Sequence, residues 1–197
     1  MSDTTYLSVA PRRFGRPDGA PGLIVREVRV GSLATLMARR GQGPALAAAV
    51  RRELGVELPQ RPRVAHAASL SFIWSGPGHW LVQSGLDPDA LAQRLDAVCA
   101  DLASAFDQSD SRVLVDLDGP RVREVLAKGF AVDLDAAAFE EGAVALGLMS
   151  HVGVQLWQMG TAPAYRIAIA RGYFGSWMRW LEASAAEYGG LQLPMSG

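Results

Sequence analysis

An internal repeat constrains the fold of this chain more than any other feature of its sequence. Gly43-Pro44 and Gly119-Pro120 lie 76 residues apart, and each pair precedes a stretch with helical spacing of apolar residues. Proline at the first helical position loses no hydrogen bond, so both pairs are typical of helix starts. At the same offset, Val56-Glu57-Leu58 corresponds to Val132-Asp133-Leu134. The sequence therefore predicts two similar halves.

Each predicted half contains a strand, a helix, two further strands and a second helix, and a further strand joins the halves. Helices are expected after Gly43, Asp87, Gly119 and Tyr173, where apolar residues recur at helical spacing. Strands are expected over 23–30, 68–75, 79–84, 112–117, 144–149, 152–158 and 164–170. This order is the split βαβ pattern, and a pair of helices covers only one face of such a sheet. We therefore expect an α+β fold made of duplicated ferredoxin-like halves.

Composition sets the expected domain boundaries. Residues 1–22 are rich in proline, glycine and arginine, and are expected to form an extended arm. Such an arm is either a frayed terminus or a segment that becomes ordered against a partner. Residues 23–190 are expected to form a single α+β domain, with halves of about 23–106 and 107–190, followed by a tail over 191–197.

The overall charge and composition exclude several classes of protein. Hydrophobic residues make up 49% of the 197 residues, enough for a substantial core, and the net charge is −1. A chain without a positive field is not a general binder of nucleic acid or of membrane surfaces. Neither a secretory signal nor a long apolar span is recognisable, so a cytoplasmic location is expected.

No motif of known catalytic or metal-binding spacing stands out. Cys99 is the only cysteine and lies beside the apolar stripe of a predicted helix, so we expect an inert buried thiol. The histidines His66, His79 and His151 lack the spacing of metal ligands. We therefore predict no catalytic, cofactor-binding or metal-binding residue in this chain.

Several runs of sequence resemble a known family. They are Asp107–Ser111 leading into 112–117, then Asp118-Gly119-Pro120, His151–Trp157, and the long run Tyr165–Leu181. Together they resemble the gamma subunit of heterotetrameric sarcosine oxidase, within the aminomethyltransferase (glycine-cleavage T-protein) folate-binding superfamily. The resemblance covers roughly residues 23–190, and it implies the fold of the folate-binding part of the T protein.

The resemblance implies a non-catalytic subunit that packs against the alpha subunit of a larger enzyme. That complex oxidatively demethylates sarcosine to glycine, forms hydrogen peroxide and passes the methyl carbon to tetrahydrofolate. Its alpha subunit is expected to carry NAD and the folate site, its beta subunit FAD and FMN, and its delta subunit zinc. The sequence does not distinguish sarcosine from other N-methyl amino acids.

One departure from the superfamily bears on catalysis. The resemblance places an acidic residue of the folate site on the strand 154–158, where this chain has Gln155 and Leu156. Neither side chain titrates, so we expect no folate chemistry here. The alternative is a stand-alone folate-binding or aminomethyltransferase-like protein of the same superfamily.

Aromatic residues and arginines concentrate near the C-terminus, and such residues anchor protein interfaces. Some of them, Tyr165, Trp177 and Trp180, are expected in the core. The residues predicted to contact a partner are Arg171, Tyr173, Phe174, Arg179 and Trp157.

Overall fold

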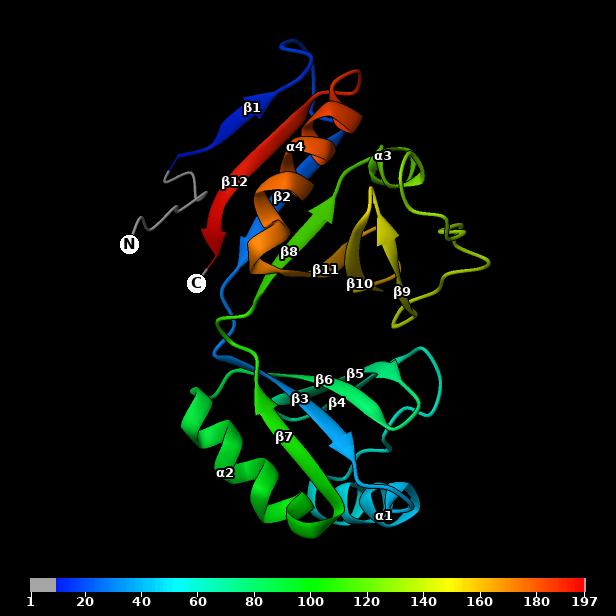
Figure 1. Ribbon diagram of the computed structural model, residues 1–197. Helices are drawn as coiled ribbons and strands as arrows, with labels where there is room; N and C mark the ends of the chain where they lie inside the picture. The colour runs from blue at the N-terminus through cyan, green and yellow to red at the C-terminus, as the bar shows by residue number, and fades with distance from the viewer. Residues whose placement is uncertain (1–9, 197) are drawn as a thin grey trace. The chain divides into compact units, whose positions relative to one another are not determined.

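The computed structural model describes residues 10–196, which divide into two compact units. The central unit comprises Val30–Asp110 and Gly142–Val144. The terminal unit comprises the residues up to Arg29, Ser111–Glu141 and the residues from Ala145 onward. Each unit is built around its own β-sheet (Figure 1).

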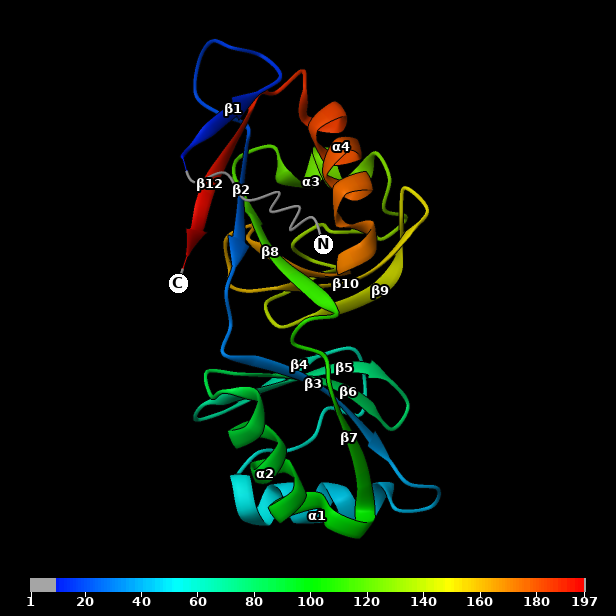
Figure 2. The ribbon, with the colours of Figure 1, turned by 60° about the vertical axis from the view of Figure 1, so that its left-hand side comes forward.

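The central unit is a five-stranded sheet with two helices on one face (Figures 1 and 2). Its strands run in the order β4-β5-β6-β3-β7, and all neighbours are antiparallel. Because β3 lies between β6 and β7, the segment β6–α2–β7 is a split βαβ unit. The elements are β3 (Ser32–Ala38), α1 (Gly43–Leu54), β4 (Val64–Ala67), β5 (Leu70–Gly76), β6 (His79–Ser84), α2 (Pro88–Cys99), the 3₁₀ turn η1 (Ala100–Leu102) and β7 (Ala103–Asp107).

Local sequence explains where the two helices of the central unit begin and end. The Asp87 carboxylate accepts a 2.9 Å hydrogen bond from the Ala90 N–H, so it satisfies one free donor at the start of α2. Gly55 ends α1 with φ of 67°, a left-handed conformation that glycine adopts without strain. Leu46 on α1 and Leu95 on α2 are fully buried against the sheet in one apolar cluster. Both helices therefore cover the same face.

The terminal unit is a seven-stranded sheet in the order β1-β12-β2-β8-β11-β10-β9, with α4 lying across it (Figure 2). β2 and β12 are parallel, whereas β8 is antiparallel to both β2 and β11. The elements are β1 (Arg12–Phe14), β2 (Leu23–Val28), β8 (Arg112–Asp118), α3 (Val122–Ala127), β9 (Val144–Met149), β10 (Val152–Gln158), β11 (Tyr165–Ala170), the 3₁₀ turn η2 (Arg171–Tyr173), α4 (Phe174–Ala185) and β12 (Gly190–Ser196).

The two sheets confirm the internal repeat. The order β4-β5-β6-β3 in the central unit matches β9-β10-β11-β8 in the terminal unit. The helices α1 and α2 correspond to α3 and α4, and β7 corresponds to β12 by its place after the second helix. The terminal unit adds β2 between β8 and β12, and β1 outside β12. The fold is therefore the expected duplicated split βαβ, with two inserted strands.

The structure sets the domain boundaries differently from the sequence interpretation. Residues 12–14 of the proposed arm form β1, while residues 1–9 lie outside the described part. The proposed tail is not a tail, because residues 190–196 form β12 alongside β2. Pro194, a residue that disfavours strand interiors, falls where the β12 register shifts. Because β2 pairs with β8, residues 23–29 belong with the second half rather than the first.

Candidate interface surface

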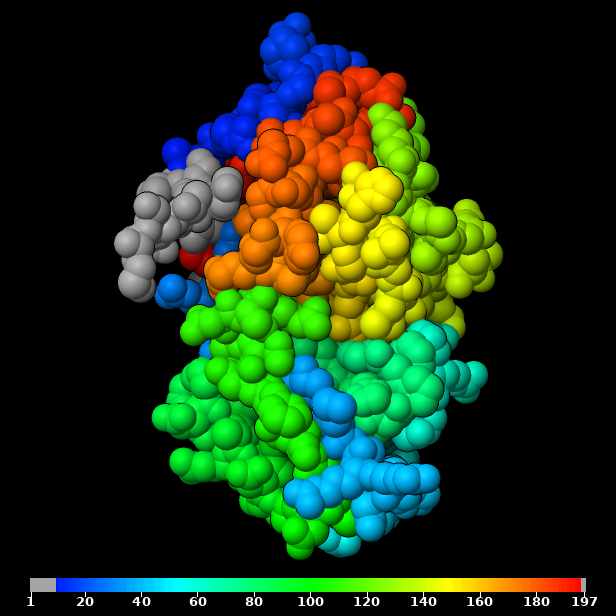
Figure 3. Space-filling view, in the orientation of Figure 1, coloured from blue at the N-terminus to red at the C-terminus, as the bar shows by residue number. Residues whose placement is uncertain are grey.

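A short exposed turn precedes α4 in the terminal unit. The turn η2 follows β11, and the Arg171 N–H donates a 2.8 Å hydrogen bond to the Ser111 carbonyl. Tyr173 is 62% exposed, an unusual position for so large an aromatic ring. Arg171 is exposed as well, and Figure 3 shows this start of α4 (orange) at the surface. An exposed tyrosine beside an arginine has the composition of an interface anchor.

A partly buried carboxyl on β2 interacts with Arg171 of this turn. The Glu27 carboxyl on β2 is partly buried, and its loss of hydration raises its pKa above the usual value. The positive charge of Arg171 acts in the opposite direction and lowers that pKa. Glu27 on β2 is therefore a half-buried carboxyl, and Arg171 of the turn is its counter-charge.

Arg179 lies further along α4 on its solvent side. Its Nη2 donates a 3.1 Å hydrogen bond to the Ser176 hydroxyl one turn earlier. Arg171, Tyr173 and Arg179 are thus the predicted contact residues that the structure places at the surface, and we call them the η2–α4 surface.

Phe174 and Trp157 need correction, because the structure buries both. Phe174 is 6% exposed and begins the apolar stripe of α4, where its ring stacks on Trp177 with centroids 6.3 Å apart. Trp157 is 5% exposed on β10, a strand whose residues from Val154 to Gln158 are buried on both faces. Both side chains are core residues, so they do not contribute to the free surface of this chain.

The strand β10 also carries the position expected for a folate carboxylate. Gln155 is 3% exposed and pairs across the ladder with Ala168, whereas Leu156 is fully buried and pairs with Ile167. An amide and an alkyl side chain hold no proton to transfer near neutral pH. The structure therefore places two non-titrating side chains at these positions.

A bidentate ion pair crosses the middle of the terminal sheet. Arg166 on β11 donates from Nε and Nη2 to the two Asp116 oxygens on β8, at 2.6 and 2.8 Å. The neighbouring Tyr165 hydroxyl accepts a hydrogen bond from Arg123 on α3, so Arg166 points to the sheet face away from the helices. Arg26 stands directly opposite Asp116 in the β2–β8 ladder.

Asp118 belongs to the same group of charges. Burial is the largest cause that raises the pKa of Asp118. The positive charge of Arg26 lowers this pKa, and the negative charge of Asp116 raises it. Two arginines and two carboxyls on adjacent strands balance one another, so the group is suited to fixing the sheet rather than to proton transfer.

The residues 10–196 contain no cluster of three or more histidine, cysteine or acidic side chains that is able to hold a metal ion. Among the same residues, no helix is long and apolar enough to cross a membrane.

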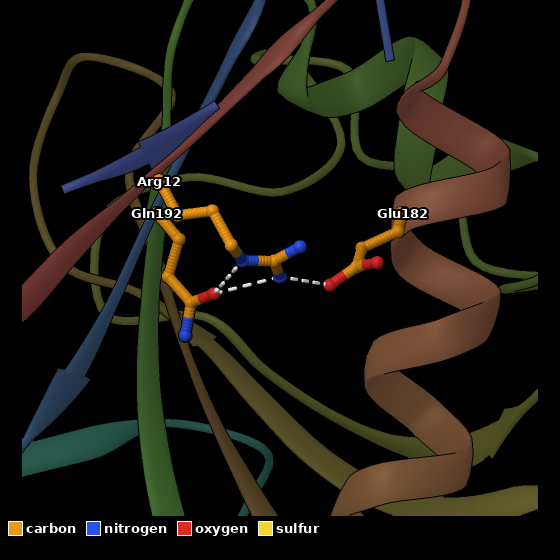
Figure 4. Close-up of polar contacts among 3 residues, drawn as sticks. All are labelled: Arg12, Glu182 and Gln192. Atoms are coloured by element: carbon orange, nitrogen blue, oxygen red, sulfur yellow. Dashed lines mark hydrogen bonds and ion pairs between the residues drawn. The ribbon is translucent and has the colours of Figure 1, made fainter. Parts of the chain in front are cut away.

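The part of the N-terminal segment from Arg12 onward packs on its own chain. β1 pairs with the outer edge of β12, and the Arg16 N–H donates a 2.8 Å hydrogen bond to the Ala186 carbonyl. Figure 4 shows Arg12 donating to Gln192 at 3.2 Å from Nε and 2.9 Å from Nη2, and pairing with Glu182 on α4. Neither interpretation of the arm foresaw this contact. Arg12 and Phe14 share one face of this three-residue strand, with Arg13 on the other.

The fold first defines a class of protein. The chain resembles the solved structure of the glycine cleavage system aminomethyltransferase T from Bartonella henselae, with a TM-score of 0.61 and 12% identity. The match covers 88% of this chain and 48% of that one. At this identity the likeness concerns the fold alone, and it makes the chain a duplicated α+β protein of the T-protein type.

The family follows from more specific matches. The model of the "Sarcosine oxidase, gamma subunit family" matches residues 40–187, and the chain belongs to this family. It is 27% identical over 173 residues to sarcosine oxidase subunit gamma from an Arthrobacter species, covering 86% of this chain and 83% of that relative. It is 22% identical over 200 residues to the subunit gamma of Corynebacterium sp. strain U-96.

A solved complex gives the same family likeness in three dimensions. A chain of the heterotetrameric sarcosine oxidase from Corynebacterium sp. U-96, determined with pyrrole 2-carboxylate, superposes with a TM-score of 0.74. The sequence identity is 28%, and the match covers 87% of each chain. Both units of the fold are thus shared with a chain of that assembly.

Proposed function

We propose that this chain is the non-catalytic gamma subunit of a heterotetrameric sarcosine oxidase, packing against the alpha subunit. The observation that carries the proposal is the match over 87% of both chains with a chain of a solved sarcosine oxidase heterotetramer. The buried Gln155 and Leu156 support the non-catalytic part, because they leave β10 without a titrating group where the superfamily is expected to have one.

The proposal includes the other components of the complex. The partners are alpha, beta and delta subunits, and the complex carries FAD, FMN, NAD and zinc, none of them held by this chain. It demethylates sarcosine to glycine, releases hydrogen peroxide and transfers the methyl carbon to tetrahydrofolate. We place it in the cytoplasm, which fractionation of the host cell would test.

Omission of this chain is the direct experiment. The four subunits are co-expressed with and without the chain, and sarcosine-dependent peroxide release is measured in matched amounts of flavin. We expect the complex lacking the chain to be less stable or to lose its alpha subunit. An equally stable and active three-subunit enzyme would contradict the proposed role.

The non-catalytic part has its own test in the purified chain. Isothermal titration calorimetry of the purified chain with tetrahydrofolate is expected to show no binding at micromolar concentration. Binding at that strength would favour the stand-alone folate-dependent alternative. A Gln155→Glu variant serves as the comparison, because it restores a carboxylate at this position.

The η2–α4 surface can be tested against the core residues beside it. Tyr173→Ala is expected to leave the unfolding free energy within about 0.5 kcal/mol and to weaken assembly, since its ring is largely exposed. Phe174→Ala is expected to cost about 3–5 kcal/mol of stability, as buried phenylalanines do. Leu148→Ala, also on the terminal unit and 64% exposed, is the matched control. Unchanged assembly with Tyr173→Ala would remove this surface from the interface.

A further inference from the structure

The central sheet ends at β7, whose outer edge pairs with no other strand among the described residues. Within residues 10–196, β7 pairs only with β3. A shallow groove runs between β7 and α2, with Leu91, Ala92, Leu95 and Ala105 among its lining residues. Phe106, the next residue on β7, is 53% exposed. The groove beside this edge is therefore largely apolar, and the exposed Phe106 ring also lines it.

The backbone of β7 has hydrogen-bonding groups directed away from the sheet. The Arg39 N–H donates to the Leu102 carbonyl, and the Gln108 N–H donates to the Leu33 carbonyl. Residues of an antiparallel ladder alternate between facing the partner strand and facing away. With this register, the N–H and C=O groups of Ala103, Ala105 and Asp107 point outward. β7 lacks proline and lysine, the residues that commonly protect an edge.

The internal repeat shows how the equivalent edge is closed in the terminal unit. There β12, the counterpart of β7, pairs antiparallel with the short strand β1. Arg12 of β1 reaches Glu182 on α4, the counterpart of α2, so the added strand fills the seam between helix and sheet (Figure 4). In the central unit this seam is the groove beside β7.

An acidic residue of α2 in the central unit occupies the position that Glu182 has on α4. The repeat aligns Leu91 with Trp177 and Leu95 with Leu181, and this alignment places Asp96 at the position of Glu182. Asp96 is exposed and makes no ion pair with any residue between 10 and 196. Asp107 lines the end of the groove, and hydrogen bonds from Ser109 lower its pKa, which keeps it negatively charged. An arginine-bearing segment complements this edge.

We propose that the open edge of β7 binds an extended segment of another subunit, added as an antiparallel strand with an apolar side chain in the α2–β7 groove and an arginine paired with Asp96. Strand addition of this kind takes its affinity from the outward backbone groups and its specificity from the alternating side chains. This inference rests on the proposed function, because it requires that the chain enters a complex.

Hydrogen exchange in the assembled complex tests the proposal. Exchange of the Ala105 and Asp107 amides is compared between the isolated chain and the purified complex. Because these N–H groups gain partners only on strand addition, their exchange should slow by at least about tenfold. Unchanged exchange in a complex that still contains the chain would overturn the strand-addition proposal alone. Failure of the wild-type chain to enter any complex would overturn the proposed function as well.

Variants distinguish a loss of binding at the β7 edge from a general loss of folding stability. Ala105→Pro removes one outward N–H without touching a hydrogen bond to β3, and should weaken assembly about tenfold. His66→Pro is the matched control, since His66 faces outward on β4, at the opposite edge of the same sheet. Phe106→Asp changes an exposed ring, so it should fold normally and still weaken assembly.

Hydrogen exchange and charge variants also test which molecule binds the edge of β7. If the isolated chain forms a dimer whose β7 amides are already protected, the partner is a second copy and the proposal of another subunit is wrong. Asp96→Arg should weaken assembly at low salt, whereas Asp101→Arg, exposed beyond the end of α2, should not. Normal assembly of all three edge variants, Ala105→Pro, Phe106→Asp and Asp96→Arg, would overturn the proposal.

Discussion

The ion pair between Arg166 and Asp116 gives the sharpest stability prediction. The two side chains make two short hydrogen bonds, and are 17% and 14% exposed. Breaking one partner of a fully buried pair costs about 3–5 kcal/mol, because the other charge stays behind unpaired. Partial exposure reduces this cost, so we expect about 2–3 kcal/mol for Asp116→Asn, which leaves Arg166 and Arg26 facing a neutral amide.

The two single variants are expected to differ. Arg166→Gln leaves Asp116 opposite Arg26 in the β2–β8 ladder, so the remaining carboxylate keeps a counter-charge. Its expected cost is about 1–2 kcal/mol, less than that of Asp116→Asn. The double variant should lie closer to the larger single effect than to the sum, because both changes remove one interaction.

Urea unfolding followed by tryptophan fluorescence measures these differences, since the chain contains five tryptophans. Asp101→Asn, at an exposed position in η1, is the control and should change the free energy of unfolding by less than about 0.5 kcal/mol. The reasoning is refuted if Asp116→Asn behaves like this control, or if Arg166→Gln is the more destabilising of the pair.

Three further predictions concern the edge of the terminal sheet and the single cysteine. Arg12→Ala should lower the free energy of unfolding by about 0.5–1 kcal/mol, because the ion pair with Glu182 is half exposed. It should also speed tryptic cleavage after Arg13, and an unchanged cleavage rate would contradict the contact between Arg12 and Glu182. Gly190→Ala should cost about 1–3 kcal/mol, since a Cβ would lie 2.1 Å from the Phe14 ring, and Phe14→Ala should relieve most of it in a thermal melt. Burial and then the Asp96 charge raise the pKa of Cys99 from 9.0 to about 11, so the thiol should resist alkylation at pH 8 until the chain unfolds. The thiol of the unfolded chain ionises at a lower pH than the buried thiol, so the free energy of unfolding should fall above about pH 9, by at most about 1.4 kcal/mol per pH unit. Cys99→Ser should abolish that decline. A decline that persists in Cys99→Ser would contradict its attribution to this thiol.

The sequence predicted the parts of the fold that carry strong local signals. The predicted helix starts after Gly43 and Asp87 were correct, because each is followed by a proline, which has a fixed geometric preference at the start of a helix. The long apolar strands β8, β10 and β11 were found within a residue or two.

Three of the strands that were missed depend on distant partners. β7 (Ala103–Asp107) is short and rich in alanine, and β12 contains a proline, so neither has a clear alternating pattern. β1 exists because β12 offers it an edge, which no local pattern of three residues predicts. Pairing with strands more than about 60 residues away in the sequence decides these strands, and local propensity does not.

The candidate surface was predicted only in part for a related reason. Helical spacing places Trp177 in the core, but it does not tell which aromatic residue begins the buried stripe, and Phe174 does. Trp157 was judged by composition, whereas burial of β10 on both faces is a property of the folded unit. Arg171, Tyr173 and Arg179 were placed correctly at the surface because they lie before the helix or outside its apolar stripe.

The proposed role in a sarcosine oxidase complex is tested most directly by isolating the tagged chain gently from its native host grown on sarcosine. The account predicts a flavin-coloured complex containing one large, one medium and one small partner, which releases peroxide when sarcosine is added. A colourless chain recovered alone, with no partner retained under any gentle condition, would contradict it.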